Sequence, residues 1–216
     1  MNLSEKFYAL VQVFSDLVFG PDEKTELLLD YLRKVRIERL RPTPLSWAYS
    51  VCSYADEKIK EVIWEIKYKG NRKIISEVTP ILHEAIMSIV DQEAEAKFTK
   101  IILCYVPSHW GRKNEKGFNQ GKLMVTSLKK LFPEYKTDLK IKKIKKTSPQ
   151  TKLDKHKRLT NLKNAFMAKI PEKYQNSESL FVIIDDVITT GATMTEIRKT
   201  LKKAGAKNVI GVAVGH

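Results

Sequence analysis

The sequence predicts an α/β fold built on a doubly wound parallel sheet. Three short apolar runs, residues 99–106, 180–184 and 208–214, are rich in β-branched side chains. Such runs are typical of strands that are buried on both faces. Segments with helical periodicity alternate with them, the last over residues 193–204. Strands that alternate with helices indicate a parallel sheet covered by helices on both sides.

The start of the chain has a different texture and is predicted to be helical. Residues 4–19 repeat apolar side chains at spacings of three and four, which indicates an amphipathic helix. A second helix is expected over residues 23–40, before a proline pair. We therefore assign residues 1–44 to an N-terminal helical region and residues 45–216 to the main domain.

The elements between these two parts follow from the same patterns. Residues 45–54 are expected to form a strand, and residues 56–68 and 72–92 form helices, with Pro80 near a helix start or kink. A further helix is expected through Leu123 to Leu131.

Charge is the unusual feature of the composition. The chain has 39 Lys and Arg against 25 Asp and Glu, a formal charge of +14. Such a field attracts polyanions, but it does not choose between nucleic acid and a phosphorylated metabolite. Residues 136–158 concentrate lysine, which fits either a single-strand nucleic-acid contact or a solvated edge strand.

Several classes of protein are excluded. Two cysteines, Cys52 and Cys104, are too few for a disulfide scaffold or a four-cysteine zinc site. No segment reaches the roughly 18–20 apolar residues of a membrane span. We expect a cytoplasmic protein without a membrane span and without zinc.

The stretch that carries chemistry follows the apolar run 180–184. Asp185 and Asp186 come directly after it, then a short loop, then a helix. In open α/β sheets, ligands bind beyond the carboxyl ends of the strands. A glycine-containing loop that leads into a helix N-terminus presents free N–H groups to an anion. The residues expected to hold a phosphate are Thr189, Thr190, Gly191, Ala192 and Thr193.

Two carboxylates beside a phosphate site repel it unless they bind hydroxyls or a cation. A ribose 5-phosphate resolves this conflict, because Asp185 and Asp186 can accept from the ring hydroxyls or hold them through Mg²⁺. The residues thus predict a phosphorylated ribose ligand with Mg²⁺.

This stretch resembles the signature of type I phosphoribosyltransferases that binds 5-phosphoribosyl-1-pyrophosphate (PRPP). The match covers the apolar strand, the two acids and the Thr/Gly loop. The resemblance implies a type I phosphoribosyltransferase-like sheet, here with an N-terminal helical extension. It also implies that Asp185 and Asp186 are catalytic and hold Mg²⁺.

Other segments resemble the ComF family, which is linked to DNA uptake and natural transformation and includes GntX-like proteins. The similarity covers about residues 45–216. Its motifs are Val106-Pro107, Gly117-Phe118-Asn119-Gln120, and a segment with Gln150, Arg158, Asn161 and Ala165-Phe166. Many ComF proteins carry an N-terminal cysteine zinc module, which this chain lacks, so no role of that module is carried over.

The resemblance also implies roles for residues outside the acid pair. The loop from Pro107 to Lys113 would hold the pyrophosphate. Its donors are Ser108, His109, Arg112 and Lys113. Lys67 would reach the same phosphates, and Arg158 and Asn161 would lie in a lid over the site, with Arg158 as a catalytic residue. Asn119 and Gln120 belong to the site through their motif.

Two functions from different classes follow. The first is a PRPP-binding, competence-associated protein that handles single-stranded DNA together with competence proteins. The alternative is a metabolic phosphoribosyltransferase that transfers ribose 5-phosphate from PRPP to a nitrogen acceptor such as a nucleobase. Thr189 stands where the 6-oxopurine enzymes have an Asp, which argues against hypoxanthine or guanine as acceptor. A PRPP sensor without turnover is a third option.

Overall fold

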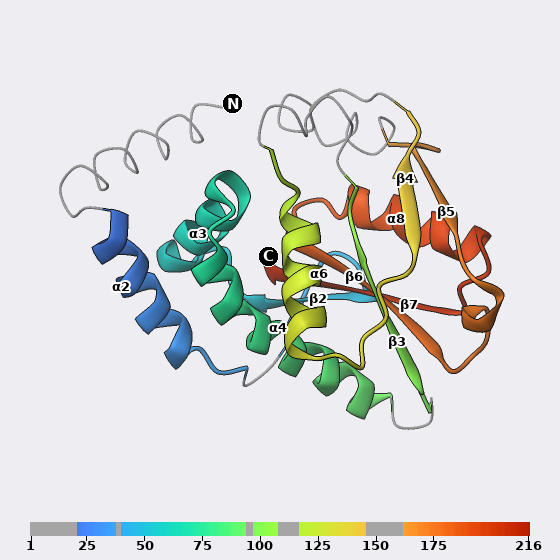
Figure 1. Cartoon of the computed structure of the whole chain (residues 1–216), viewed down its shortest axis with the longest axis horizontal. Helices are drawn as coiled ribbons and strands as arrows, with labels where there is room; N and C mark the ends of the chain where they lie inside the picture. Colours follow the sequence, from blue (N-terminus) through green and yellow to red (C-terminus); the bar gives the residue numbers. More distant parts are fainter. Residues whose placement is uncertain (1–20, 38–39, 94–96, 108–116, 146–161) are drawn as a thin grey trace.

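The computed structural model describes residues 21–37, 40–93, 97–107, 117–145 and 162–216. Figure 1 shows a central sheet with helices on both sides. The elements in chain order are α2 (Pro21–Lys34), β1 (Arg41–Pro42), β2 (Ala48–Cys52), α3 (Glu57–Trp64), the π-helix η1 (Glu65–Lys69), α4 (Arg72–Gln92), β3 (Lys100–Tyr105), α6 (Gln120–Leu131), β4 (Lys140–Lys143), β5 (Phe166–Lys169), the 3₁₀ turn η3 (Glu172–Tyr174), β6 (Ser179–Val187), α8 (Ala192–Lys203) and β7 (Asn208–Gly215).

The main sheet is mostly parallel. Its strand order is β1-β2-β7-β6-β3, and only the two-residue strand β1 runs antiparallel to its neighbour. Strands β2, β7, β6 and β3 are parallel, so their carboxyl ends lie at one edge of the sheet. The predicted α/β class with a parallel sheet is confirmed, and β6 occupies an interior position in it.

Strand β6 has apolar side chains on both faces, and each face is buried under its own layer of the structure. Leu180, Val182 and Ile184 belong to the core beneath α2, α3, α4 and α6. Phe181 and Ile183 belong to a second core with α8 and β5. Each fully buried side chain of this size contributes roughly 1.5–3 kcal/mol relative to exposure. Both layers are thus needed to cover this strand.

Some predicted elements differ at their ends. Strand β6 continues through Val187, because its ladder with β7 runs on to Gly215, so Asp185 and Asp186 lie inside the strand rather than after it. Pro80 lies within α4 and does not begin a helix. The second predicted helix ends at Lys34, and the third changes to π-helical hydrogen bonding after Trp64.

The described part of the lysine-rich segment begins at the edge of the main sheet, where Lys136 forms a parallel bridge with Ile102 of β3, and then leaves that sheet. Strand β4 pairs antiparallel with β5 in a separate two-stranded sheet, which lies beside α8 at the right of Figure 1. Residues 146–158 of that segment and the predicted helix over residues 4–19 lie outside the described residues. Among the described helices, none combines the length and the apolar character that crossing a membrane requires.

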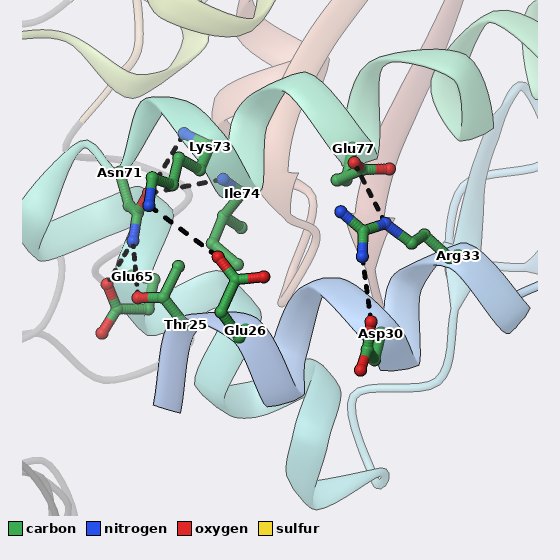
Figure 2. A network of polar contacts seen from close by, with 9 residues as sticks. All are labelled: Thr25, Glu26, Asp30, Arg33, Glu65, Asn71, Lys73, Ile74 and Glu77. Atoms are coloured by element: carbon green, nitrogen blue, oxygen red, sulfur yellow. Dashed lines mark hydrogen bonds and ion pairs between the residues drawn. The ribbon is translucent and has the colours of Figure 1, made fainter. Parts of the chain in front are cut away.

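Helix α2 is joined to α4 by apolar and polar contacts. Its residues Leu28, Leu29 and Leu32 are buried in the same core as α4. Figure 2 shows the polar part, in which Asn71 links three elements. The Asn71 amide donates to Glu65 Oε2 at 3.0 Å and to Thr25 Oγ1 at 3.4 Å.

Asn71 also begins α4. Its Oδ1 accepts from the N–H groups of Lys73, at 3.1 Å, and Ile74, at 3.4 Å, which are otherwise unpaired at a helix start. Nearby, Arg33 bridges Asp30 and Glu77 between α2 and α4 at the surface. The predicted domain boundary at residue 44 stays a prediction. Helix α2, which precedes it, packs on the core of the main domain.

We expect Asn71→Ala to lower the free energy of unfolding by about 1–2 kcal/mol, because it removes a helix cap. It also removes a hydrogen-bond donor to Glu65, which is 2% exposed. Arg33→Ala, which removes only exposed ion pairs, should cost less than about 1 kcal/mol. Urea unfolding measures both, and equal costs would contradict a linking role for Asn71.

Candidate functional site

The acid pair occupies the carboxyl end of β6. Each carboxylate accepts a hydrogen bond from the N–H group of the residue after it. Asp185 Oδ1 accepts from Asp186 N at 3.0 Å, and Asp186 Oδ1 accepts from Val187 N at 3.0 Å. These contacts use one oxygen of each side chain and fix both carboxylates at the ligand-binding edge of the sheet.

The environment of the pair disfavours two negative charges. Burial, and then the neighbouring Asp186, raise the pKa of Asp185 well above its ordinary value, while Lys67 acts in the opposite direction. By accessible surface Asp185 is only partly buried. Partial burial at the strand end and the negative charge of Asp186 both favour the neutral carboxyl, so both raise the pKa of Asp185.

Asp186 carries the most informative atom of the site. The residue is 4% exposed, and its Oδ2 is buried with no hydrogen-bond partner among the described residues. A buried acceptor without a partner costs on the order of 1–3 kcal/mol. Such an atom calls for a ligand donor or a cation.

The loop after the strand leads directly into α8. Ile188 N donates to Gly215 O at 3.0 Å, so the start of the loop is tied to β7. Thr190 Oγ1 accepts from Ala192 N at 3.4 Å. The N-cap residue of α8, Gly191, has no side chain with which to cap the helix. The first turn of this helix therefore presents N–H groups and the positive end of its dipole to the loop.

Gly191 is required at this point for two reasons. Its φ is +69°, in the left-handed region that favours glycine. A Cβ built on it would also lie 2.5 Å from Leu45 Cδ1. The connection between β1 and β2 thus lies directly against the loop.

That connection was not singled out from the sequence. Leu45 covers Gly191, and the Arg198 guanidinium lies 4.7 Å from the centre of the Trp47 ring. Both contacts join α8 to residues far away in the chain. No local pattern signals them, because they arise only when β2 and β7 pair.

Lys67 lies near the acid pair, on η1. Its charge lowers the pKa of Asp185, although burial and Asp186 outweigh it. The π-helical turn is anchored by Glu65, whose Oε1 is 3.0 Å from Lys69 Nζ. Gly70 ends the turn with φ +61°, and a Cβ there would lie 3.0 Å from the Phe118 ring. Turns of this kind are frequent at functional sites.

Asn119 has a structural task that the sequence did not reveal. Its Oδ1 caps α6 by accepting from Lys122 N at 2.7 Å, and its amide donates to Val106 O at 3.0 Å. The second bond joins the chain after β3 to the start of α6. Gln120 is the first residue of α6 and is partly buried.

The remaining predicted site residues are not described by the structure. They belong to the predicted pyrophosphate loop and lid, and they are Ser108, His109, Arg112, Lys113, Arg158 and Asn161. The described part of the site consists of the acid pair, the Thr/Gly loop and Lys67.

The acid pair fits a divalent cation. Within the described residues no group of three or more His, Cys, Asp or Glu gathers to form a metal cage. Mg²⁺ typically takes one or two carboxylates and completes its octahedron with phosphate oxygens and water. Asp186 Oδ2, buried and without a partner, fits such a ligand set together with Asp185.

The stability of the protein should depend on pH through Asp185. Because the pKa is raised on folding, the folded state holds this proton more tightly, and the charged carboxyl destabilises the fold increasingly above about pH 4. Asp185→Asn should therefore raise Tm at pH 7, where a gain of 1 kcal/mol corresponds to roughly 2–4 °C. The gain should shrink toward pH 4. A Tm that falls at pH 7 would contradict this charge balance.

Gly191→Ala should destabilise the loop by about 1–3 kcal/mol, since it combines a left-handed backbone with the contact to Leu45. Thermal unfolding measures the loss. The double variant with Leu45→Ala relieves the contact but not the backbone strain, and it should be less destabilised than the sum of the two single variants. Strict additivity would show that Leu45 does not press on this loop.

Comparison with known proteins gives related sequences. The chain is 34% identical to Competence protein F of Haemophilus influenzae over 104 residues, which span 48% of this chain and 45% of that protein. It is 28% identical to DNA utilization protein YhgH of Shigella flexneri over 169 residues, which span 78% of this chain and 71% of that protein. No family model matches the chain. The two relatives support the ComF resemblance of the sequence motifs.

Proposed function

We propose that this protein binds PRPP with Mg²⁺ at the acid pair and the Thr/Gly loop, and that it acts in DNA uptake. The main support for this ligand is Asp186 Oδ2, which is buried and has no hydrogen-bond partner among the described residues. Beside it, the charged form of Asp185 is disfavoured, since its pKa is raised. A ribose with a phosphate group supplies what this site lacks, since its hydroxyls are donors to carboxylates.

The two ends of the ligand have different partners in this proposal. Asp185 and Asp186 accept from the 2′- and 3′-hydroxyls and hold Mg²⁺, which offsets the charge of the pyrophosphate. The N–H groups at the start of α8, with Thr189, Thr190 and Thr193, hold the 5-phosphate. Each hydrogen bond to the charged phosphate contributes about 1.5–3 kcal/mol, more than the helix dipole.

Lys67 is a described residue whose positive charge acts on Asp185 of the acid pair. Its effect on the pKa of Asp185 supports a position from which it would contact the pyrophosphate. The partly buried Asp185, the buried Asp186 and this cation give a site with both signs of charge, which suits a ligand with hydroxyls at one end and pyrophosphate at the other. A type I phosphoribosyltransferase-like core is part of this proposal, supported by the mostly parallel sheet and the acid–loop–helix sequence.

The part of the proposal that concerns DNA has separate support. The relatives are named for competence and DNA utilization. The formal charge of +14 favours association with polyanions. Together they support a role in DNA uptake, with single-stranded DNA and competence proteins as partners.

Calorimetric titration with Mg²⁺ and PRPP tests the ligand. Wild-type protein should show saturable binding, and Asp185→Asn/Asp186→Asn should reduce the affinity at least about 100-fold, since two charge-assisted contacts of about 1.5 kcal/mol or more are lost. The control variant Asp30→Asn/Asp91→Asn also loses two carboxylates, but exposed ones outside the site, and it should bind PRPP like wild type. Wild-type protein that is folded and binds no PRPP would sink the proposal.

Transfer is the second candidate, because the same acid pair and loop would hold PRPP for attack by a nitrogen nucleophile at the anomeric carbon with loss of pyrophosphate. Release of pyrophosphate that depends on an added acceptor, measured over a panel of nucleobases and amines, separates it from binding without turnover. Release without any acceptor would indicate hydrolysis instead.

A further inference from the structure

A groove lies between α8 and the two-stranded sheet β4–β5, away from the acid pair. Its volume is about 450 Å³. Figure 1 shows β4 and β5 beside α8, and α8 contacts β5 directly. The residues that line it come from both elements and from the turn before β5, and the argument uses Ile144, Lys163, Phe166, Met167, Lys199 and Lys203.

The rim of this groove is positively charged. Lys163, Lys199 and Lys203 are exposed, and none of them forms an ion pair within the described part of the chain. Lys199 and Lys203 are four residues apart on α8, so their Cβ atoms lie about 6 Å apart on one face. Solvated lysines at this spacing fit a row of phosphates.

Glu196 also lines the groove, and its carboxylate already accepts a hydrogen bond from the backbone. Glu196 is 9% exposed, and its Oε1 accepts from Asn164 N at 2.7 Å. That bond holds Asn164 at φ +56°, at the turn that leads into β5. Glu196 therefore shapes the groove, while the lysines give its rim a positive charge.

The floor of the groove is apolar and partly open. Ile144 is 59% exposed and Met167 is 54% exposed, so both side chains are open to contact with a ligand. Phe166 also lines the groove, but it is 6% exposed and belongs to the core with α8, so Ile144 and Met167 supply the open apolar surface. An apolar floor between lysines suits a ligand that carries flat apolar faces and phosphates together.

Single-stranded DNA has this combination, because its bases are unpaired and their faces are available for contact. In a duplex the base faces are stacked inside, and only the phosphates would meet the groove. We propose that the groove between α8 and the two-stranded sheet β4–β5 is the surface on which this protein binds single-stranded DNA. The proposal rests on the DNA part of the function proposed above and gives it a location.

The groove is separate from the PRPP site although one helix serves both. Helix α8 starts at Ala192 beside the Thr/Gly loop, and Lys199 and Lys203 lie about 10 Å and about 16 Å further along its axis. Both ligands can therefore be bound at once, and a change in the groove should leave PRPP binding intact.

The test is fluorescence anisotropy of a labelled oligothymidylate titrated with full-length protein at several salt concentrations. Lys163→Ala/Lys199→Ala/Lys203→Ala should lower the affinity on the order of 10–100-fold near 0.1 M salt. It should also reduce the slope of log K against log salt by roughly 2, at about 0.7 for each lost phosphate contact.

The matched control is Lys34→Ala/Lys97→Ala/Lys130→Ala, which removes the same charge from exposed lysines outside the groove. It should change affinity less than about threefold. Ile144→Ser/Met167→Ser tests the floor and should weaken binding severalfold with the salt slope unchanged, because apolar contacts release no counterions. Circular dichroism and PRPP calorimetry confirm that each variant is folded.

The outcomes separate this inference from the proposed function. If wild-type protein binds the oligonucleotide and the groove variant binds it equally well, the location is wrong while DNA binding stands. If wild-type protein binds no single strand at low salt, the inference fails with the DNA part, and PRPP binding is judged by its own titration. Duplex DNA that binds as tightly, with the same loss in the groove variant, would overturn the single-strand assignment.

Discussion

The burial of β6 on both faces is the constraint on which the rest of the structure depends. An interior strand with apolar side chains on each side must be covered by two layers, and its neighbours β3 and β7 run parallel to it. The helix that covers the second face, α8, follows the strand directly. Because the crossover starts at the carboxyl end of β6, the loop between strand and helix lies at the ligand-binding edge. The acids and the Thr/Gly loop therefore meet for topological reasons.

This edge is not arranged for stability. Two adjacent carboxylates with a raised pKa at Asp185 and a buried oxygen at Asp186 without a partner both oppose folding. Lys67 offsets only part of this, and a hydrophobic pair would fit a strand end at lower cost. Groups that strain a fold in this way are concentrated at functional sites. In the proposed complex, the ribose hydroxyls and Mg²⁺ would supply partners for the buried oxygen of Asp186 and offset the repulsion between the two carboxylates.

The surroundings of the acids are rigid for identifiable reasons. The turn that carries Lys67 is fixed by the Glu65–Lys69 ion pair and by Asn71, and Gly70 lets the Phe118 ring pack against its end. Asn119 holds the chain after β3 to the start of α6. Asn119 of the Gly-Phe-Asn-Gln motif thus stabilises the framework around the site through these hydrogen bonds. Further along the same helix, α8 contributes one wall of the lysine-rimmed groove.

The sequence by itself determined the α/β class, the buried strands and the acid–loop–helix segment. Those features depend on periodicity and on neighbouring residues, which a single chain segment contains. It did not determine that β6 extends past the acids, because the ladder with β7 decides where a strand ends. Nor did it indicate that Leu45 packs on Gly191, or that Glu196 and residues next to β4 and β5 line a groove. Each of these contacts joins residues far apart in the chain, so only the tertiary pairing of strands and helices could decide them.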